Sequence, residues 1–233
     1  MLSADAHNLA DQYAGPLLNG FRFTALVFVG GVVIATLVAL LVGTARLSRY
    51  RAIRLPAIAF VEIFRGTSAL VQLFWVFYAL PLVLGISFQP LTAAWIVIGF
   101  NQGAYLAEVV RSGIRAVPAG QVEASISINL PPTVRWRRIV LPQAVPIMLP
   151  SYTNHVITIL KETAIVSLIG IADLTYTANT LRTQHGNTTV LFITIALIYL
   201  VVALTIARGG KLLERRFNVR RPTKKSRAAA VPA

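Results

Sequence analysis

A run of apolar residues from Phe23 to Val42 constrains this chain more than any other feature of its sequence. As an α-helix, about 20 residues span about 30 Å, which is enough to cross the hydrocarbon core of a bilayer. Four further runs of this kind follow, at roughly Pro56–Leu84, Leu91–Val110, Val145–Ile171 and Val190–Ala207. The sequence therefore predicts an all-α integral membrane protein with about five transmembrane helices.

The composition agrees with burial in lipid rather than with a soluble fold. Of the 233 residues, 56% are hydrophobic and only 13% are charged, a balance that is unusual for a soluble globular domain. The length leaves no room for a large soluble enzyme domain, so we expect one membrane domain over 1–233. Cysteine is absent, which excludes disulfides, thiolate metal sites and a cysteine nucleophile.

The formal net charge of +14 is explained by membrane topology. The basic residues lie between the apolar runs rather than on one face of a soluble fold, so no nucleic-acid binding is expected. They are concentrated after the first span, after the third span and in a tail over 208–233, and basic residues mark cytoplasmic segments. We therefore expect the N-terminus outside, the C-terminus in the cytoplasm, and a basic cytoplasmic tail.

The connection between the third and fourth spans, about 115–142, is too patterned to be a simple linker. Pro118 can begin a short helix, because its missing N–H group would be unpaired there in any residue. Asn129 tolerates the left-handed backbone conformation of a turn, and the prolines that follow it can end one helix and begin another. The pattern predicts two short helices at an angle, 118–128 and 133–140, in a cytoplasmic knob.

Part of this connection forms a recognisable pattern, at Glu123–Ser125, Asn129–Leu130 and Leu141–Pro142. It resembles the EAA loop of binding-protein-dependent ATP-binding-cassette (ABC) importers, although Ser125 replaces an alanine and Asn129 a glycine. The resemblance implies a coupling helix that sits in a groove of an ATPase subunit and transmits nucleotide-driven closure to the spans. The coupling residues that it implies are Gly120, Glu123, Ala124, Ser125, Asn129 and Leu130.

Other segments resemble the polar amino acid branch of these importers: VEIFRGTSALVQLF from Val61, AYLAEVVRSGIRAVPAGQ from Ala104 and ILKETAIVSLIG from Ile159. A helix-bending proline of the branch is replaced here by Ser68. The resemblance implies a multi-pass permease of the bacterial cytoplasmic membrane that translocates a polar amino acid or similar small zwitterion by alternating access. It also implies two ABC ATPase subunits that bind Mg-ATP, a second permease of the same or a homologous chain, and an extracytoplasmic solute-binding protein.

Charged side chains near the cytoplasmic ends of the second and third spans are expected to face inward or to pair. At the bilayer centre, exposing a charge to lipid costs at least about 2.5 kcal/mol. Glu62 and Arg65 are three residues apart, as are Tyr105 and Glu108, so each set can share one helix face. Structural ion pairs between helices are the first interpretation of these charges, and a gating role is the second.

Lys161 and Glu162 lie deep inside the fourth apolar run and imply a polar cavity. Together with Thr163 they can bind the carboxylate and ammonium groups of a zwitterion, or they can form an ion pair or a gate. Adjacent helix positions point about 100° apart, so the sequence does not choose between these roles. The candidate residues for a substrate pathway or gate are Glu62, Arg65, Thr67, Gln72, Tyr105, Glu108, Lys161, Glu162 and Thr163.

The sequence contains no recognisable motif for nucleotide binding, metal binding or catalysis. It contains no GxxxxGKS or GxxxxGKT phosphate loop, so ATP hydrolysis is expected on partner subunits and no cofactor is expected in this chain. His7, His155 and His185 have no metal-site spacing, and no catalytic arrangement is visible, so no enzyme activity is predicted. A passive polar-solute channel is the alternative, because polar residues within spans can line a pore. The coupling loop favours the importer.

Overall fold

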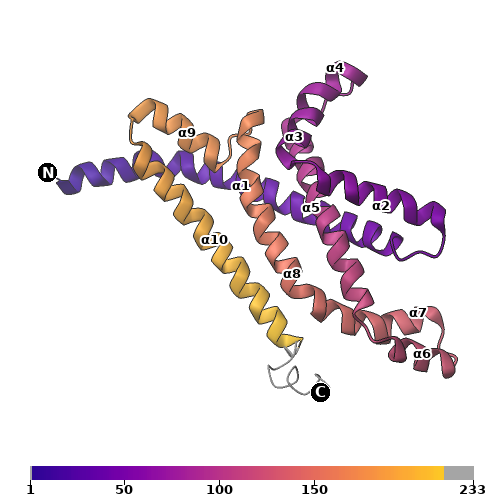
Figure 1. Ribbon diagram of the computed structural model, residues 1–233. Coiled ribbons are helices and arrows are strands. Elements are labelled where there is room, and N and C mark those ends of the chain that lie inside the picture. The colour runs from indigo at the N-terminus through magenta and orange to yellow at the C-terminus, as the bar shows by residue number, and fades with distance from the viewer. Residues whose placement is uncertain (1, 218–233) are drawn as a thin grey trace, which may run out of the picture.

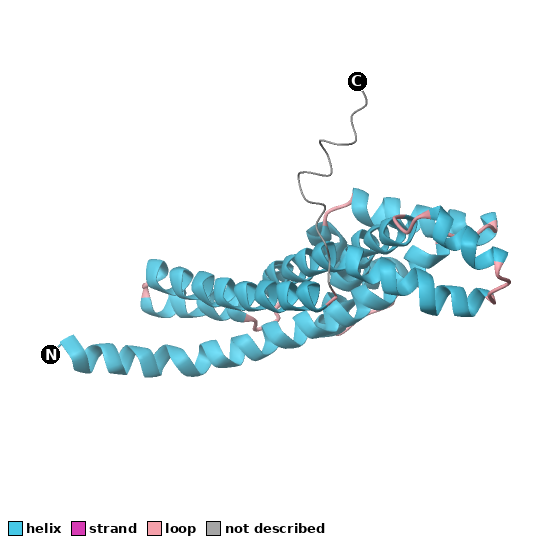
Figure 2. Ribbon diagram, turned by 90° about the horizontal axis from the view of Figure 1, so that it is seen from below, coloured by secondary structure: helices cyan, strands magenta, loops and turns pink. Residues whose placement is uncertain are grey.

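The computed structural model describes residues 2–217, with side chains from Tyr13 onward except that of His185. Within this range every regular element is a helix, as Figure 2 shows, and the predicted all-α class is confirmed. The basic tail predicted over 208–233 begins inside the last helix, α10 (Thr188–Arg216). Its residues 218–233 lie outside the described part of the chain.

Three helices are long and apolar enough to cross a membrane on their own: α1 (Leu2–Ala45), α5 (Pro90–Arg115) and α10 (Figure 1). Two further crossings form if each bent helix pair counts as one span. Residues 51–66 and 69–84 meet at 102°, and residues 132–169 and 174–184 meet at 52°. Counted in this way, the described residues contain five spans, the number that the apolar runs predict.

The bent pairs and the coupling loop are built from shorter helices. The first pair consists of α2 (Arg51–Gly66), then α3 (Ala69–Phe74), the π-helical turn η1 (Trp75–Ala79) and α4 (Leu80–Leu84). The coupling loop contains α6 (Ala119–Ser127). The second pair consists of α7 (Pro132–Arg135), the π-helical turn η2 (Trp136–Val140), α8 (Leu141–Glu162), the 3-10 helix η3 (Thr163–Ile169) and α9 (Leu174–His185).

Close packing of α1 against α5 forms the centre of the fold, and it is the most extensive helix–helix contact in the described chain. Glycines permit it. A Cβ atom at Gly103 would lie 2.7 Å from Cγ1 of Val38, and one at Gly43 would lie 2.8 Å from the carbonyl oxygen of Ala107. Small residues at such contacts let two membrane helices approach closely, so that van der Waals contacts hold them together in lipid.

The bend before α9 is built around Gly170 and Asp173. Gly170 has a φ of 83°, a left-handed conformation that suits glycine. Asp173 is fully buried, and its Oδ1 accepts a hydrogen bond from the N–H group of Tyr176 at 2.9 Å, which caps the helix. The N–H group of Leu174 donates to Oγ1 of Thr24 at 3.1 Å. This second bond joins the start of α9 to α1.

The second predicted short helix, 133–140, does not end before the fourth span. The residues that join α7, η2 and α8 have helical backbone angles, so these segments form one continuous helix. Proline is compatible with a helical φ although it cannot donate the backbone hydrogen bond. Accordingly, α8 contains Pro142 in its first turn and Pro146 and Pro150 in its interior.

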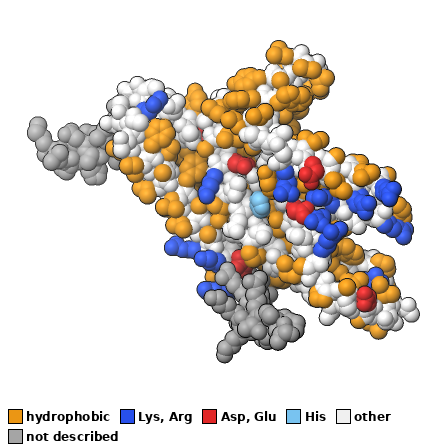
Figure 3. Space-filling view, in the orientation of Figure 1, with side chains coloured by type: hydrophobic (Ala, Val, Ile, Leu, Met, Phe, Trp, Pro, Cys, Tyr) orange, Lys and Arg blue, Asp and Glu red, His pale blue; other side chains and the backbone are white. Residues whose placement is uncertain are grey.

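Basic side chains gather at particular helix ends. In Figure 1, α6, α7 and the end of α10 lie at the lower edge of the view, and α4 and α9 lie at the upper edge. Figure 3 shows Lys and Arg side chains gathered over the end of α1 and the start of α2, and beside the end of α10. This distribution follows the loops that the sequence assigns to the cytoplasm.

The orientation of the chain in the membrane can be tested with single introduced cysteines, because the chain has no cysteine of its own that would react. Ser87 lies between α4 and α5, Ala52 lies in the first turn of α2, and both are exposed. We expect a membrane-impermeant thiol reagent to label Ser87→Cys in intact cells but Ala52→Cys only after permeabilisation. Labelling of both variants from the same side would contradict the predicted topology.

Candidate functional site

A polar cavity of about 250 Å³ lies where the bend between α2 and α3 meets the middle of α5 and the end of α8. Other cavities of the described chain are lined almost entirely by apolar side chains. We call it the polar pocket, and its lining residues are Thr67, Ser68, Ala69, Asn101, Gln102, Tyr105, His155, Thr158 and Glu162. Thr67, Tyr105 and Glu162 were candidates from the sequence, whereas Asn101, Gln102 and His155 were not.

Glu162 supplies a carboxyl group to the polar pocket. Its Oε1 accepts a hydrogen bond of 2.6 Å from Nε2 of Gln102, and Oε1 of Gln102 lies 3.1 Å from Nδ1 of His155. These contacts fix the carboxylate across α5 and α8. Its second oxygen, Oε2, is buried and has no hydrogen-bond partner among the described residues. A buried polar atom is normally paired, so this oxygen is available to accept a hydrogen bond from a ligand.

Lys161 and Thr163, the neighbours of Glu162, point away from the polar pocket. Lys161 is exposed, and Thr163 is fully buried, with Oγ1 donating to the carbonyl oxygen of Leu160 at 2.7 Å. The same oxygen lies 3.3 Å from the hydroxyl of Tyr199 in α10. Of the three consecutive residues that the sequence singled out, the fold therefore brings only Glu162 to the cavity.

Side-chain amides hold the bend between α2 and α3. Nε2 of Gln72 donates to Oγ1 of Thr67 at 2.7 Å and to the carbonyl oxygen of Phe64 at 3.0 Å. Nδ2 of Asn101 donates to the same carbonyl at 3.0 Å. These bonds satisfy a carbonyl that the end of α2 leaves unpaired. The chain thus bends by 102° although Ser68 replaces the proline of the related branch.

Arg65, Tyr105 and His155 stack beside the polar pocket. The guanidinium carbon of Arg65 lies 5.1 Å from the ring centroid of Tyr105, and the rings of Tyr105 and His155 are 5.8 Å apart at 29°. The Tyr105 hydroxyl donates to the carbonyl oxygen of Arg65 at 3.3 Å. His155 has no metal-site spacing to the other histidines, so the sequence did not indicate it as a site residue. Its position seven residues before Glu162, on the same helix face, is the signal that could have found it.

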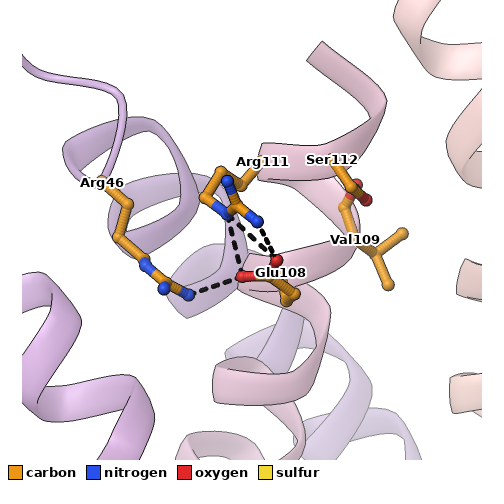
Figure 4. Close-up of polar contacts among 5 residues, drawn as sticks. All are labelled: Arg46, Glu108, Val109, Arg111 and Ser112. Carbon is orange, nitrogen blue, oxygen red and sulfur yellow. Dashed lines mark hydrogen bonds and ion pairs between the residues drawn. The ribbon is translucent and has the colours of Figure 1, made fainter. Parts of the chain in front are cut away.

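Glu108 lies between two arginines near the end of α5 (Figure 4). Its Oε2 lies 2.6 Å from Nη1 of Arg46, which follows α1, and Arg111 one turn further along α5 binds both carboxylate oxygens. This cluster ties the end of α1 to α5. Glu62 and Arg65, which the sequence places on one helix face, form no ion pair with another described residue, and Glu62 is exposed.

The coupling loop places a row of small or acidic side chains on its surface. Gly120, Glu123, Ala124 and Ser127 are exposed and follow the i, i+3, i+4, i+7 spacing of one helix face, which we call the outer face of α6. Ser125 lies on the opposite side and is buried, so the residue that departs from the family alanine faces its own chain.

The turn after α6 takes the conformation that its residues favour. Asn129 has a φ of 53°, in the left-handed region. The N–H group of Leu130 then donates to the carbonyl oxygen of Ser125 at 3.0 Å, and Nη2 of Arg135 donates to the carbonyl oxygen of Leu130 at 3.2 Å. The turn therefore has its own hydrogen bonds, and it directs the chain from α6 into α7.

Comparison with known proteins identifies close relatives. Residues 31–219 match the family described as "Binding-protein-dependent transport system inner membrane component". The chain is 37% identical over 218 residues to a probable amino-acid ABC transporter permease of Sinorhizobium fredii, covering 91% of this chain and 90% of that protein. It is 31% identical over 202 residues to the arginine transport system permease ArtQ of Bacillus subtilis, covering 87% of this chain and 92% of that protein.

Solved structures give the same result. The chain is similar to a chain of an amino acid ABC transporter crystallised with histidines, with a TM-score of 0.81, 35% identity, and coverage of 88% of this chain and 95% of that one. A chain of the methionine ABC transporter MetNI in an inward-facing conformation matches with a TM-score of 0.66, 21% identity, and coverage of 88% and 95%. The second match shows a common fold.

Proposed function

Because the chain belongs to the family of binding-protein-dependent transport system inner membrane components, we propose that it translocates a polar amino acid or similar small zwitterion in an ABC importer. It is a multi-pass protein of the bacterial cytoplasmic membrane. Relatives named for amino acids, glutamine and arginine support this substrate class. The passive channel considered from the sequence is not favoured, since relatives along almost the whole chain are permeases of ATP-driven transporters.

Oxygen Oε2 of Glu162 is the observation that carries the substrate proposal. The α-ammonium group of an amino acid has N–H donors and a positive charge, so it supplies what this buried carboxylate oxygen lacks. Gln102 holds the other oxygen at 2.6 Å and orients the carboxylate before the solute arrives. The pocket volume of about 250 Å³ lies below the range of about 300–1,000 Å³ typical of drug-sized ligands, which suits a small solute.

The outer face of α6 supports the proposed partners. An exposed carboxylate at Glu123 beside the small Ala124 suits docking into a basic groove of an ATPase subunit. In chain order, α6 stands between α5 and α8, and both of these helices line the polar pocket. Movement of α6 is thereby transmitted to the pocket along the chain in two directions, back into α5 and forward through α7 into α8.

The proposed assembly pairs this chain with a second permease, of the same or a homologous sequence, above two ABC ATPase subunits. Those subunits bind and hydrolyse Mg-ATP, and an extracytoplasmic solute-binding protein delivers the solute to the outer side. Nucleotide-driven closure of the ATPases moves the coupling loops, and the pocket becomes open to one side of the membrane at a time.

Removing the charge of Glu162 tests the substrate site. Glu162→Gln keeps the size of the side chain but removes the charge-assisted bond, so we expect uptake at low solute concentration to fall at least about tenfold. Uptake is measured in proteoliposomes that contain the full assembly, its binding protein and ATP. Lys161→Ala removes the neighbouring charge but leaves the pocket lining intact, and it is expected to retain more uptake. If Lys161→Ala lost more uptake than Glu162→Gln, the substrate site would lie at Lys161. Wild-type uptake by Glu162→Gln would contradict the proposed pocket.

A further inference from the structure

We propose that the stack of Arg65, Tyr105 and His155 is the gate that closes the polar pocket on the side of the coupling loop. This inference rests on the proposed function, since it assigns a role within the same solute pathway. Tyr105 and His155 both line the pocket, and the guanidinium group of Arg65 lies over the Tyr105 ring. Each residue comes from a different helix, α5, α8 and α2 respectively, so the stack joins the helices that surround the pocket.

The stack lies on the coupling-loop side of the pocket in the two long helices. On α5, which runs toward the coupling loop, Tyr105 follows Gln102 by three residues, a rise of about 4.5 Å. On α8, which runs away from the coupling loop, His155 precedes Glu162 by seven residues, a rise of about 10 Å. A solute bound at Glu162 must therefore pass the level of these rings to leave toward the coupling loop.

The third member of the stack agrees with this placement. Arg65 lies in the last turn of α2, two residues before Thr67 of the pocket lining, and a helical side chain points back toward the N-terminus of its helix. The α2 helix begins directly after the basic connection that follows α1, so its N-terminus lies on the predicted cytoplasmic side. The guanidinium group is thus directed toward the predicted cytoplasmic side of the pocket. There its carbon lies 5.1 Å from the centroid of the Tyr105 ring.

The contacts within the stack are weak enough to suit a gate that must open in every transport cycle. Cation–π and ring-stacking contacts hold the three side chains together, with one hydrogen bond of 3.3 Å from the Tyr105 hydroxyl to α2. Neither Arg65 nor His155 takes part in an ion pair with another described residue. Because α5 and α8 are the helices that the coupling loop connects, a change in their separation parts Tyr105 from His155 directly.

Truncating the central ring tests the gate. In proteoliposomes that contain the full assembly, with the ATPase subunits held by a non-hydrolysed ATP analogue, solute flux through wild type should be low. We expect Tyr105→Ala to raise this flux about tenfold or more, because the ring that fills the exit is lost. Tyr105→Phe keeps the ring and loses only the hydroxyl, and it should leak much less than the alanine variant.

A cross-link gives a second measurement that does not depend on truncation. The chain has no cysteine, so Tyr105→Cys together with His155→Cys provides a single reactive pair from α5 and α8. Its ATP-driven uptake is compared before the cross-linker, after it and after reduction. A short, reducible cross-linker should decrease the remaining uptake, and reduction should restore it. Uptake that is unchanged by the cross-link would overturn the gate.

The two proposals fail in different ways. If Glu162→Gln lowers uptake but Tyr105→Ala does not leak and the cross-link has no effect, the pocket is the substrate site and the gate lies elsewhere. If Glu162→Gln retains wild-type uptake while Tyr105→Ala leaks, the stack closes a pathway in which Glu162 does not bind the solute. If Tyr105→Ala fails to assemble and the cross-link has no effect on uptake, the stack is structural and the gate proposal is wrong.

Discussion

Glu123→Arg is expected to abolish solute-stimulated ATP hydrolysis while the permease still inserts into the membrane. Glu123 is exposed on the outer face of α6 and makes no ion pair with another described residue, so the change disturbs no internal contact of that kind. Charge reversal in a docking site replaces attraction by repulsion and costs several kcal/mol, which corresponds to at least about a hundredfold weaker ATPase docking. ATP hydrolysis and uptake by the purified assembly measure the effect.

A steric change at the neighbouring position provides an independent test of the same face. Ala124 is exposed and small, so Ala124→Trp should prevent close approach of a groove without changing any charge. Glu214→Arg, at the end of α10, is the control because it makes the same charge reversal away from α6. Wild-type coupling in both Glu123→Arg and Ala124→Trp would rule out the outer face of α6 as the docking surface.

Gly103→Leu is expected to destabilise the permease itself. A Cβ atom at this position would lie 2.7 Å from Val38 Cγ1 and 3.2 Å from the carbonyl oxygen of Ala35, so α1 must move away from α5. Overpacking of this kind typically costs about 1–3 kcal/mol, and a leucine side chain adds further atoms. We expect a lower yield of monodisperse protein and a lower melting temperature in detergent.

Gly209→Leu is the matched control for this change. Gly209 lies within α10, like Gly103 within α5, but a Cβ atom there would have no neighbour within 4 Å. The same substitution should therefore leave the melting temperature near that of wild type. Equal melting temperatures for both leucine variants would show that the α1–α5 contact does not require glycine.

The sequence predicted the features that depend on local patterns. Apolar runs located the spans because a bilayer requires long apolar helices whatever their partners are. The turn at Asn129 was also predictable, since few residues adopt a positive φ without strain. The continuous helix from α7 to α8 was not, because Pro142 suggested that the second short helix ends at Val140, whereas proline in the first turn of α8 is compatible with a continuing helix.

Features that depend on distant residues could not be predicted from local patterns. Glu108 pairs with Arg46, which is 62 residues away, and the first bend is held by an amide of Asn101 on another helix. The choice between Lys161 and Glu162 depended on which face of α8 meets α5. Gln102 and His155 gave no sequence signal as a pair, because their contact exists only after α5 and α8 pack.

The prolines of α8 give this helix a direction of easy bending. Pro142, Pro146 and Pro150 are four residues apart, so each lies about 40° round the helix from the last. Each lacks the N–H group that would bond to the carbonyl four residues before it, which removes backbone restraint along one side of the helix. We therefore expect α8 to bend more readily over this stretch than a helix of the same length with all its backbone bonds. A push at α6 would then reach His155 as a bend of α8 and not only as the shift of a rigid rod.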